Sequence, residues 1–315
     1  MPGSTISSFT DPDDFSSAVR GSNTDLLVTA RGDFHAEVLT IDLNRLWMLR
    51  NNEPLPAVVR QSISSGRVTI MFRSTPAQGT IHHNSKEFPP DALLLYGHDS
   101  VNHFRMAGPF CGAAMSLSTD DLAATGEAIL GRELAAPRDS VVRQPPLAAI
   151  AHLSSLHEAA CSLARTTPDI LAHPEVATSM EQALIRGMIA CLSDRSITHL
   201  KPTPTRHARI ISKFQDYLAA RRYQPVHLPE VCTAVGASER TLRACCEEHF
   251  GMGPIRYLWL RRMHLARRAL LRASAATATV TSIATELGFW ELGRFSVEYR
   301  ALFGESPREA LRRPS

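Results

Sequence analysis

The sequence predicts an α+β protein with a β-rich N-terminal part, a set of helices after it, and an all-α C-terminal part. Apolar residues alternate at a period of two in residues 66–72, which is typical of a half-buried strand. From Thr119 onward, apolar residues recur at helical spacing instead. Beyond residue 205 this helical spacing is joined by an excess of arginine, so the C-terminal part differs from the rest in both pattern and charge.

Strands and turns are expected from about residue 25 to residue 117. A second strand candidate is the apolar run 92–96, which follows Pro89 and Pro90 and precedes Gly97. Proline and glycine at these positions mark the ends of a strand. Short strands separated by such turns predict a small sheet or a cupin-like barrel.

Three helices are expected between the strands and the C-terminal part, over residues 122–130, 150–164 and 174–191. Within the second of them, apolar or small residues recur three or four positions apart and therefore share one helix face. Two interpretations stay open for these amphipathic helices: they form a dimerisation surface, or they cover the sheet.

These patterns divide the chain into three regions. Residues 1–145 form the β-rich region, and residues 146–200 form a helical region that ends in a linker. The linker is expected over residues 194–205, where two prolines interrupt the helical pattern. Residues 205–315 form the all-α region.

Charge is distributed unevenly along the chain. The formal net charge is +3, but residues 201–315 carry 19 Lys and Arg against 10 Asp and Glu, which is +9, so residues 1–200 carry −6. Of the 19 cations in the basic part, 17 are Arg, whose planar guanidinium binds phosphate or a guanine edge through two hydrogen bonds. The basic part is therefore expected to bind nucleic acid.

Other classes of protein are disfavoured. No run reaches the roughly 18 apolar residues of a membrane-spanning helix, and no secretory signal pattern is present. The six cysteines lack C-x-x-C spacing, so neither a zinc site nor a disulfide framework is expected. Because no nucleophile, phosphate-loop or paired-carboxylate motif stands out, we expect a soluble cytoplasmic protein without a cofactor, and not an enzyme.

A helix-turn-helix pattern occupies residues 228–246. A short helix would end at Gly236, which can take the left-handed backbone that a tight turn needs. Ser238 would then cap a second helix. Arg240 and Arg243 would lie on the outer face of that second helix, which has the width to enter the major groove of DNA.

The same pattern returns in residues 280–299, with Gly288 at the turn and with Phe295 and Tyr299 among the inward positions. Between the two motifs, residues 254–271 predict one continuous helix. At about 1.5 Å per residue this helix would span ~25 Å, which suits two recognition helices held near the ~34 Å repeat of the duplex.

The second motif also carries a family pattern, which comprises Ile283-Ala284, Leu287-Gly288-Phe289, Phe295-Ser296, Tyr299, Phe303-Gly304 and Ser306-Pro307. With it, residues 207–312 resemble the DNA-binding domain of the AraC/XylS transcription regulators. The run 288–295 is similar to the subgroup that contains ethanolamine-operon regulators and regulators of aromatic-acid catabolism. The resemblance covers the C-terminal third of the chain.

The resemblance implies a ligand-responsive transcription activator. Residues 1–145 would sense a small-molecule effector, residues 146–200 would form a homodimer, and residues 205–315 would bind double-stranded promoter DNA in two adjacent major grooves and contact RNA polymerase. Two alternatives stay open. One is an effector-independent DNA-binding regulator whose N-terminal region serves dimerisation or partner binding, and the other is a metal enzyme fused to a DNA-binding tail.

Base contacts carried over by position fall in the two recognition helices. In the first helix they are Arg240, Arg243 and Ala244, with Glu239 and Thr241 beside them. In the second helix and at its start they are Glu291, Leu292, Gly293, Arg294, Ser296 and Val297. Of these, the base-edge positions are Leu292, Gly293, Ser296 and Val297, which are poor in hydrogen-bonding groups, so the second unit would read thymine methyl groups or mainly grip phosphate.

Candidate effector ligands in the β-rich region are Arg45, Trp47, Arg50, Arg73 and His103, which lie on or near expected strands. Their cations could pair with a carboxylate effector, although structural ion pairs explain them equally well.

Four histidines of the β-rich region, His82, His83, His98 and His103, suggest a cupin-like metal site. Their spacing lacks the His-x-His plus carboxylate arrangement that such sites use, so no metal is expected there.

Two further assignments concern the basic region. Trp290 is expected to pack in the core rather than to touch the DNA backbone. Arg261, Arg262, Arg267 and Arg268, on the expected long helix, either bind phosphate or form intramolecular ion pairs.

Overall fold

The computed structural model describes residues 2–64, 66–74, 79–98, 100–193, 206–221 and 224–313. The linker expected over residues 194–205 lies outside these described residues. The chain divides into two compact units. The first comprises Met1–Leu26, His35–Pro54 and Val59–Lys201, and the second comprises Leu27–Phe34, Leu55–Val58 and Pro202–Ser315.

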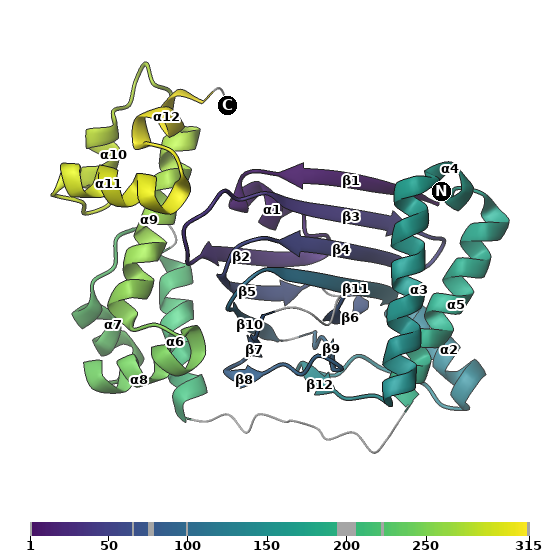
Figure 1. Cartoon of the computed structure of the whole chain (residues 1–315). Coiled ribbons are helices and arrows are strands. Elements are labelled where there is room, and N and C mark those ends of the chain that lie inside the picture. The colour runs from purple at the N-terminus through teal and green to yellow at the C-terminus, as the bar shows by residue number, and fades with distance from the viewer. Residues whose placement is uncertain are drawn as a thin grey trace. The chain divides into compact units, whose positions relative to one another are not determined.

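Two sheets form the β-rich region (Figure 1). The larger sheet has the strand order β1 (Gly3–Phe9), β3 (Ala36–Asp42), β4 (Trp47–Glu53), β11 (Phe110–Ser118), β6 (Arg67–Arg73), β9 (Leu93–Leu95) and β12 (Val141–Arg143). The smaller sheet has the order β2 (Ser22–Val28), β5 (Ala57–Ile63), β10 (Val101–Met106), β7 (Ile81–His83) and β8 (Lys86–Glu87). The strands predicted over 66–72 and 92–96 are thus present as β6 and β9.

One face of the larger sheet carries the core of the first unit. Met115 on β11 lies opposite Met48 on β4 and Ile70 on β6, and all three side chains are fully buried. Because side chains alternate along a strand, every second residue of these strands faces this core. Leu153 and Leu184, from two of the predicted helices, pack into the same core.

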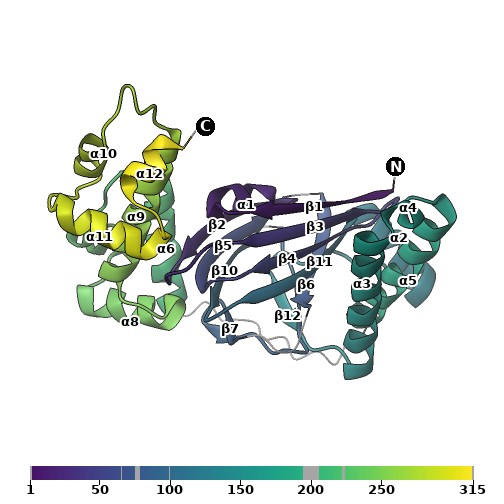
Figure 2. The same cartoon turned by 45° about the horizontal axis from the view of Figure 1, so that its top comes forward.

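The helices predicted after the strands are present as α2 (Thr119–Leu130), α3 (Leu147–Thr166) and α5 (Pro174–Ser193), with the short α4 (Pro168–Leu171) between the last two. Figures 1 and 2 show α3 and α5 side by side against the strands. Their buried residues join the core of the sheet, which supports the interpretation that they cover it. A dimerisation role for the same helices stays a prediction.

Two N-terminal elements were not anticipated from the sequence, the edge strand β1 and helix α1 (Pro12–Ala18). β1 carries little apolar alternation and is held by its antiparallel pairing with β3. Helix α1 begins at Asp11, whose side chain accepts hydrogen bonds from the amides of Asp13 and Asp14 at 2.7 and 3.2 Å. A cap of this kind explains an acidic cluster at a helix start.

The described residues from 206 onward form helices only. They are α6 (Arg206–Ala220), α7 (Leu228–Val235), α8 (Glu239–Phe250), α9 (Pro254–Arg272), α10 (Val280–Glu286), α11 (Leu292–Phe303) and α12 (Pro307–Arg312). The long helix predicted over 254–271 is confirmed as α9, which contacts α8, α10 and α12. Within the described part of the chain, none of the helices combines the length and the apolar character needed to cross a membrane.

Candidate DNA interface

The first helix-turn-helix unit has the local geometry that its sequence predicts. Helix α7 ends at Gly236, which has a φ of 67° and whose N–H donates to the carbonyls of Cys232 and Thr233. Two residues later the Ser238 hydroxyl accepts from the amide of Thr241 at 3.2 Å and starts α8. Glycine alone takes the left-handed conformation without a steric cost, so the turn is tight because of this residue.

Helix α8 buries one face and exposes the other. Leu242 and Cys246 are fully buried against the core that includes α7. Arg240, Arg243 and Ala244 are exposed, as an outward recognition face requires. Glu239, also exposed, lies 3.9 Å from the Arg243 guanidinium, and the half-buried Thr241 sits in the capping turn.

Arg240 differs from Arg243 in its electrostatic partners. Among the residues that the structure describes, it forms no ion pair, so its guanidinium is available to a ligand from solution. The Arg243–Glu239 pair is long and exposed, and exposed pairs of this kind contribute ~0–1 kcal/mol. A phosphate or a guanine edge can therefore compete for both arginines.

The second unit repeats the geometry with different residues. Helix α10 begins with a reciprocal capping box between Thr279 and Ser282. The chain turns at Gly288, which has a φ of 80°. Phe289 then enters the core, where its ring lies 4.6 Å from that of Phe295 on α11.

Trp290 was expected in the core, and this prediction is wrong: 78% of its surface is exposed. The reason is that Phe289 already fills the core position after the turn, so the next side chain points outward. Val297, one of the predicted contact residues on α11, is 71% exposed. Leu292 is half-buried and packs against the core, whereas Gly293 is exposed.

Three polar side chains of α11, those of Arg294, Ser296 and Glu298, have partners within the protein. The Arg294 guanidinium hydrogen-bonds to Glu298 at 2.9 Å and lies 3.8 Å from Glu291. The hydrogen bond that Arg294 donates to the Glu298 carboxylate raises the pKa of Arg294. Ser296 donates its hydroxyl hydrogen to the carbonyl of Leu292 at 2.9 Å.

Glu298 also ties α11 to α9. The indole N–H of Trp259 donates to Glu298 Oε2 at 3.0 Å, and the guanidinium of Arg256 lies 4.1 Å from the Trp259 ring centroid. These two residues were not singled out from the sequence, because the contact joins positions 39 apart in the chain. The network sets the rotation of the second recognition helix on the central helix.

Two of the α9 arginines have structural roles. Arg261 donates to the carbonyls of Leu218 at 3.0 Å and Gln224 at 3.2 Å, and so caps the end of α6. Arg267 is buried and lies 3.5 Å from Glu305. For these two, the intramolecular alternative is the one that the structure supports.

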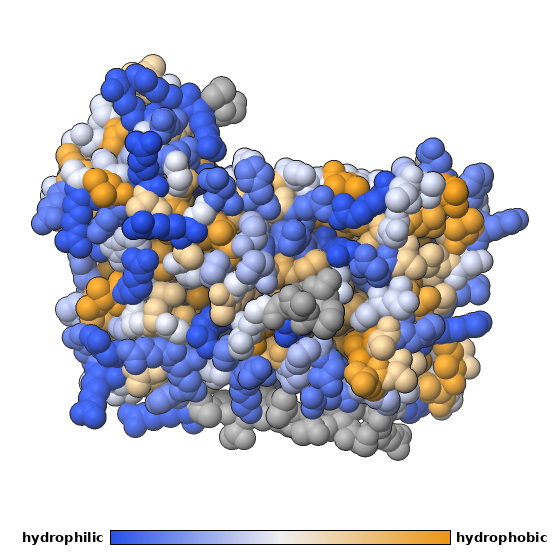
Figure 3. All heavy atoms as spheres, in the orientation of Figure 1, coloured by the Kyte–Doolittle hydropathy of each residue, from blue (hydrophilic) through white to orange (hydrophobic). Residues whose placement is uncertain are grey.

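The other two α9 arginines named above, Arg262 and Arg268, are half-buried. The Arg262 guanidinium lies 5.4 Å from the Phe289 ring centroid, close to the second turn, and burial lowers its pKa. Hydrophilic residues cover most of the visible surface of α6–α12 in Figure 3, interrupted by small hydrophobic patches.

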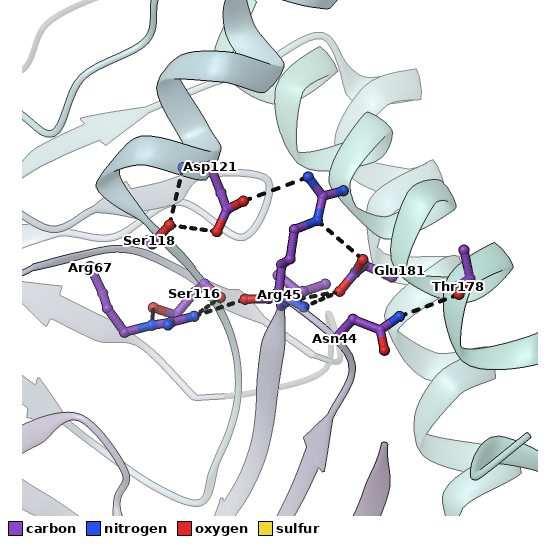
Figure 4. Close-up of polar contacts among 9 residues, drawn as sticks. Asn44, Arg45, Arg67, Ser116, Ser118, Asp121, Thr178 and Glu181 are labelled. Atoms are coloured by element: carbon purple, nitrogen blue, oxygen red, sulfur yellow. Dashed lines mark hydrogen bonds and ion pairs between the residues drawn. The ribbon is translucent and has the colours of Figure 1, made fainter. Parts of the chain in front are cut away.

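In the first compact unit, which contains most of the β-rich region, Arg45 is held by carboxylates of two helices (Figure 4). Glu181 of α5 is buried and accepts from the backbone N–H groups of Arg45 and Leu46, the latter at 3.0 Å, while the Arg45 side chain lies 3.4 Å from Glu181 and 3.6 Å from Asp121 of α2. This arrangement fixes the turn between β3 and β4 on the helices.

The other predicted effector residues do not gather at one place. Arg50 lies on the helix-facing side of β4 and pairs with Glu158 of α3 at 2.6 Å. Trp47 and Arg73 lie on the opposite face of the sheet, opposite Ser116 and Gly112 of β11, respectively. Residues of the two groups point to different sides, because Trp47 and Arg50 are an odd number of positions apart.

Three histidines of the smaller sheet lie on its neighbouring strands β7 and β10. His83 is buried, its Nε2 lies 2.9 Å from the Asn102 side-chain oxygen, and burial lowers its pKa to about 4. His103 is half-buried, and its backbone N–H donates to Asn84 Oδ1 at 3.0 Å. Over the described residues, no group of three or more His, Cys, Asp or Glu side chains is placed to hold a metal ion.

Comparison with known proteins defines the class of the basic unit. Residues 231–313 match a protein-family model described as a helix-turn-helix domain. The chain is 39% identical over 148 residues to a probable thc operon regulatory protein of Rhodococcus erythropolis, which covers 46% of this chain and 44% of that protein. It is 40% identical over 75 residues to an XylDLEGF operon transcriptional activator of Pseudomonas putida, which covers 24% of this chain and 23% of that protein.

Both curated relatives are therefore matched over less than half of their own length. Among solved structures, the AraC-like transcriptional activator CuxR is similar over 90% of this chain and 98% of that one, at 14% identity and a TM-score of 0.45. The basic unit is a helix-turn-helix domain of the type found in AraC/XylS regulators. The resemblance drawn from residues 207–312 is thereby confirmed for this part of the chain.

Proposed function

We propose that the protein is a transcription activator that binds promoter DNA through two helix-turn-helix units. The observation that carries the proposal is the repetition of the unit around α9, with α8 and α11 each presenting an exposed face. Recognition helices lie in the major groove with their N-terminal residues at the base edges. Predicted contacts at Glu239, Arg240, Thr241 and Arg243 lie at that end of α8.

The names of the relatives support the regulatory part of the proposal, since both are described as acting on operons. In this proposal the protein works in the cytoplasm, as a homodimer that contacts RNA polymerase, and without catalysis. The pairing of α3 and α5 on the surface of the first unit offers the dimer a helical face.

The first compact unit, with the β-rich region, is proposed to sense a small-molecule effector. Of the predicted effector residues, Trp47 and Arg73 share a sheet face, with Arg20 and Arg67 guanidinium groups 5.4 and 5.8 Å from the Trp47 ring centroid. Such a face suits an anionic or aromatic ligand. Arg45 and Arg50 are committed to carboxylates of the helices, so they are less suited to that role.

Selection from randomised duplex DNA with the full-length protein tests the DNA-binding proposal. We expect a motif with two short half-sites about one helical turn apart, and we expect its first half-site to vanish in the double variant Arg240→Ala/Arg243→Ala. The matched control is Arg308→Ala/Arg312→Ala, which removes the same charge from exposed positions on α12. A pool that stays random, with binding that only fades as salt rises, contradicts the proposal.

A further inference from the structure

The apolar surface of α11 is unusual for a helix in a basic unit. Trp290 and Val297 are among the most exposed large hydrophobic side chains of the described chain, at 78% and 71%. Large exposed apolar groups that lie close together mark a contact surface. Both residues belong to the second helix-turn-helix unit, whose proposed partner is the DNA duplex.

The two residues, Trp290 and Val297, lie just before α11 and in its first half, respectively. Trp290 immediately precedes Glu291, the N-cap residue of α11, and Gly293 and Val297 are four residues apart on one helix face. A Cβ atom placed on Gly293 would meet nothing within 4 Å. The glycine therefore leaves this part of the helix surface open, where a base edge can approach the backbone closely.

Two hydrogen-bonding groups in the first half of the same helix, those of Arg294 and Ser296, already have partners within the protein. Ser296 donates to the Leu292 carbonyl, and Arg294 is held by Glu298, whose other oxygen accepts from Trp259. Reading a base through these groups would first break an interaction within the protein. The apolar side chains carry no such cost, because nothing described covers them.

In the major groove, only thymine presents an apolar group, the methyl on C5. We propose that α11 reads the C5-methyl groups of thymine through Trp290 and Val297, while α8 reads hydrogen-bonding edges through its arginines. This inference rests on the proposed function, since it assigns the base chemistry of the second half-site. Burial of one methyl group between these side chains strengthens binding about fourfold.

Replacement of thymine by uracil tests the inference, because uracil lacks only that methyl. Two randomised duplex libraries, one made with dTTP and one with dUTP, are put through selection with the full-length protein. We expect both pools to yield the same first half-site. The thymine preference of the second half-site should appear in the dTTP pool and disappear from the dUTP pool.

Dissociation constants of the selected duplex complete the test. Each thymine-to-uracil change in the second half-site should weaken DNA binding by the wild-type protein about fourfold. The same change should leave the DNA affinity of the Trp290→Ala/Val297→Ala variant unchanged. The control Ile255→Ala, which truncates another exposed apolar residue of the basic unit, should keep the wild-type sensitivity.

Three outcomes overturn the inference. A second half-site that is unchanged in the dUTP pool shows that hydrogen bonds carry the specificity there. A uracil effect that persists in the Trp290→Ala/Val297→Ala variant assigns the methyl contact to other residues. If neither pool yields a first half-site, the proposed function fails as well, which separates that failure from the other two.

Discussion

The two recognition helices, α8 and α11, have the same length of 12 residues and the same place after a tight turn, yet they present different chemistry. The outer face of α8 carries Arg240, free of ion pairs among the described residues, and Arg243 in a long exposed pair. Val297 on α11 and Trp290 just before its N-cap are exposed, and Arg294 of α11 pairs with Glu298. One backbone geometry thus presents two kinds of outer surface.

The difference also lies in what each helix rests on. Helix α8 packs on its inner side through Leu242, Cys245 and Cys246, and the exposed Glu248 pairs with His207 of α6. Helix α11 adds a polar clamp to its apolar packing, the Trp259–Glu298 hydrogen bond. A helix whose rotation is clamped suits contacts between apolar surfaces, which depend on close fit, whereas long arginine side chains adapt to small changes in position.

The largest expected effect separates the two helices by charge. Arg240→Ala and Arg243→Ala should each weaken specific DNA binding by about 1–3 kcal/mol if they contact bases. Trp290→Ala/Val297→Ala should weaken it less and leave the slope of log K against log salt unchanged, because no phosphate contact is lost. Equilibrium binding at several salt concentrations checks both. If all variants have the same salt slope and only Trp290→Ala/Val297→Ala loses affinity, the arginines of α8 do not contact DNA and the comparison is wrong.

The clamp between α9 and α11 gives the next effect. Trp259→Phe removes the hydrogen bond to Glu298 and keeps an aromatic ring, so unfolding free energy should fall by about 1 kcal/mol. Binding to the second half-site should weaken and binding to the first should not. Glu298→Gln is the matched variant, since it keeps an acceptor for Trp259 and loses the charge that holds Arg294. If both variants affect the half-sites equally, the clamp has only a structural role.

Gly293→Ala should raise the stability of the protein and lower its affinity for the second half-site. Alanine favours a helix over glycine by roughly 0.5–1 kcal/mol, and its Cβ meets no neighbour, so the unfolding transition should shift to a higher denaturant concentration. The added methyl nevertheless occupies the open space on the outer face, and affinity for the second half-site should drop. Denaturation and binding curves of the same preparation measure both effects, and unchanged affinity would mean that this face does not approach DNA closely.

The smallest expected effect is a pH dependence confined to α8. Burial lowers the pKa of His249 below its ordinary 6.5, against the opposing influence of Glu248 and of the Cys245 carbonyl, which accepts from Nδ1 at 3.1 Å. Below pH 6.5 the unfolded state binds the proton more readily, so α8 loses stability as the pH falls. Helix α11 contains no histidine.

Hydrogen exchange of the full-length protein resolves this effect by segment. Protection factors of α8 should fall between pH 7.5 and 5.5 in the wild type and change less in His249→Gln, while those of α11 stay level. The variant also serves as the control for the exposed His207–Glu248 pair, which it leaves in place. Identical profiles for the two proteins would show that His249 does not govern the acid response.

Local signals in the sequence were sufficient to predict most of the helices and turns of the basic C-terminal unit. Gly236 and Ser238 act through contacts within four residues, so their roles as turn and cap follow from the chain alone. The helices over 119–193 were likewise visible from spacing. The edge strand β1 was missed because it lacks apolar alternation and depends on β3, a partner distant in sequence.

The prediction for Trp290 was wrong for a related reason. Sequence shows two adjacent aromatic residues after a turn, and only the packing decides that Phe289 takes the core position against Phe295. The arginines of α9 were ambiguous in the same way. Arg261 caps α6 and Arg267 approaches Glu305, and both partners lie about 40 residues away in the chain.

Sequence by itself determined the basic charge of the C-terminal unit, the two turns and the family of the domain, because each depends on composition or on neighbours within one helical turn. Tertiary structure alone decided which side chains face outward on α11, which arginines are free, and which carboxylates hold Arg45 and Arg50. Those outcomes depend on competition for burial and for ion-pair partners among residues that are distant in sequence, and no local pattern records which competitor wins.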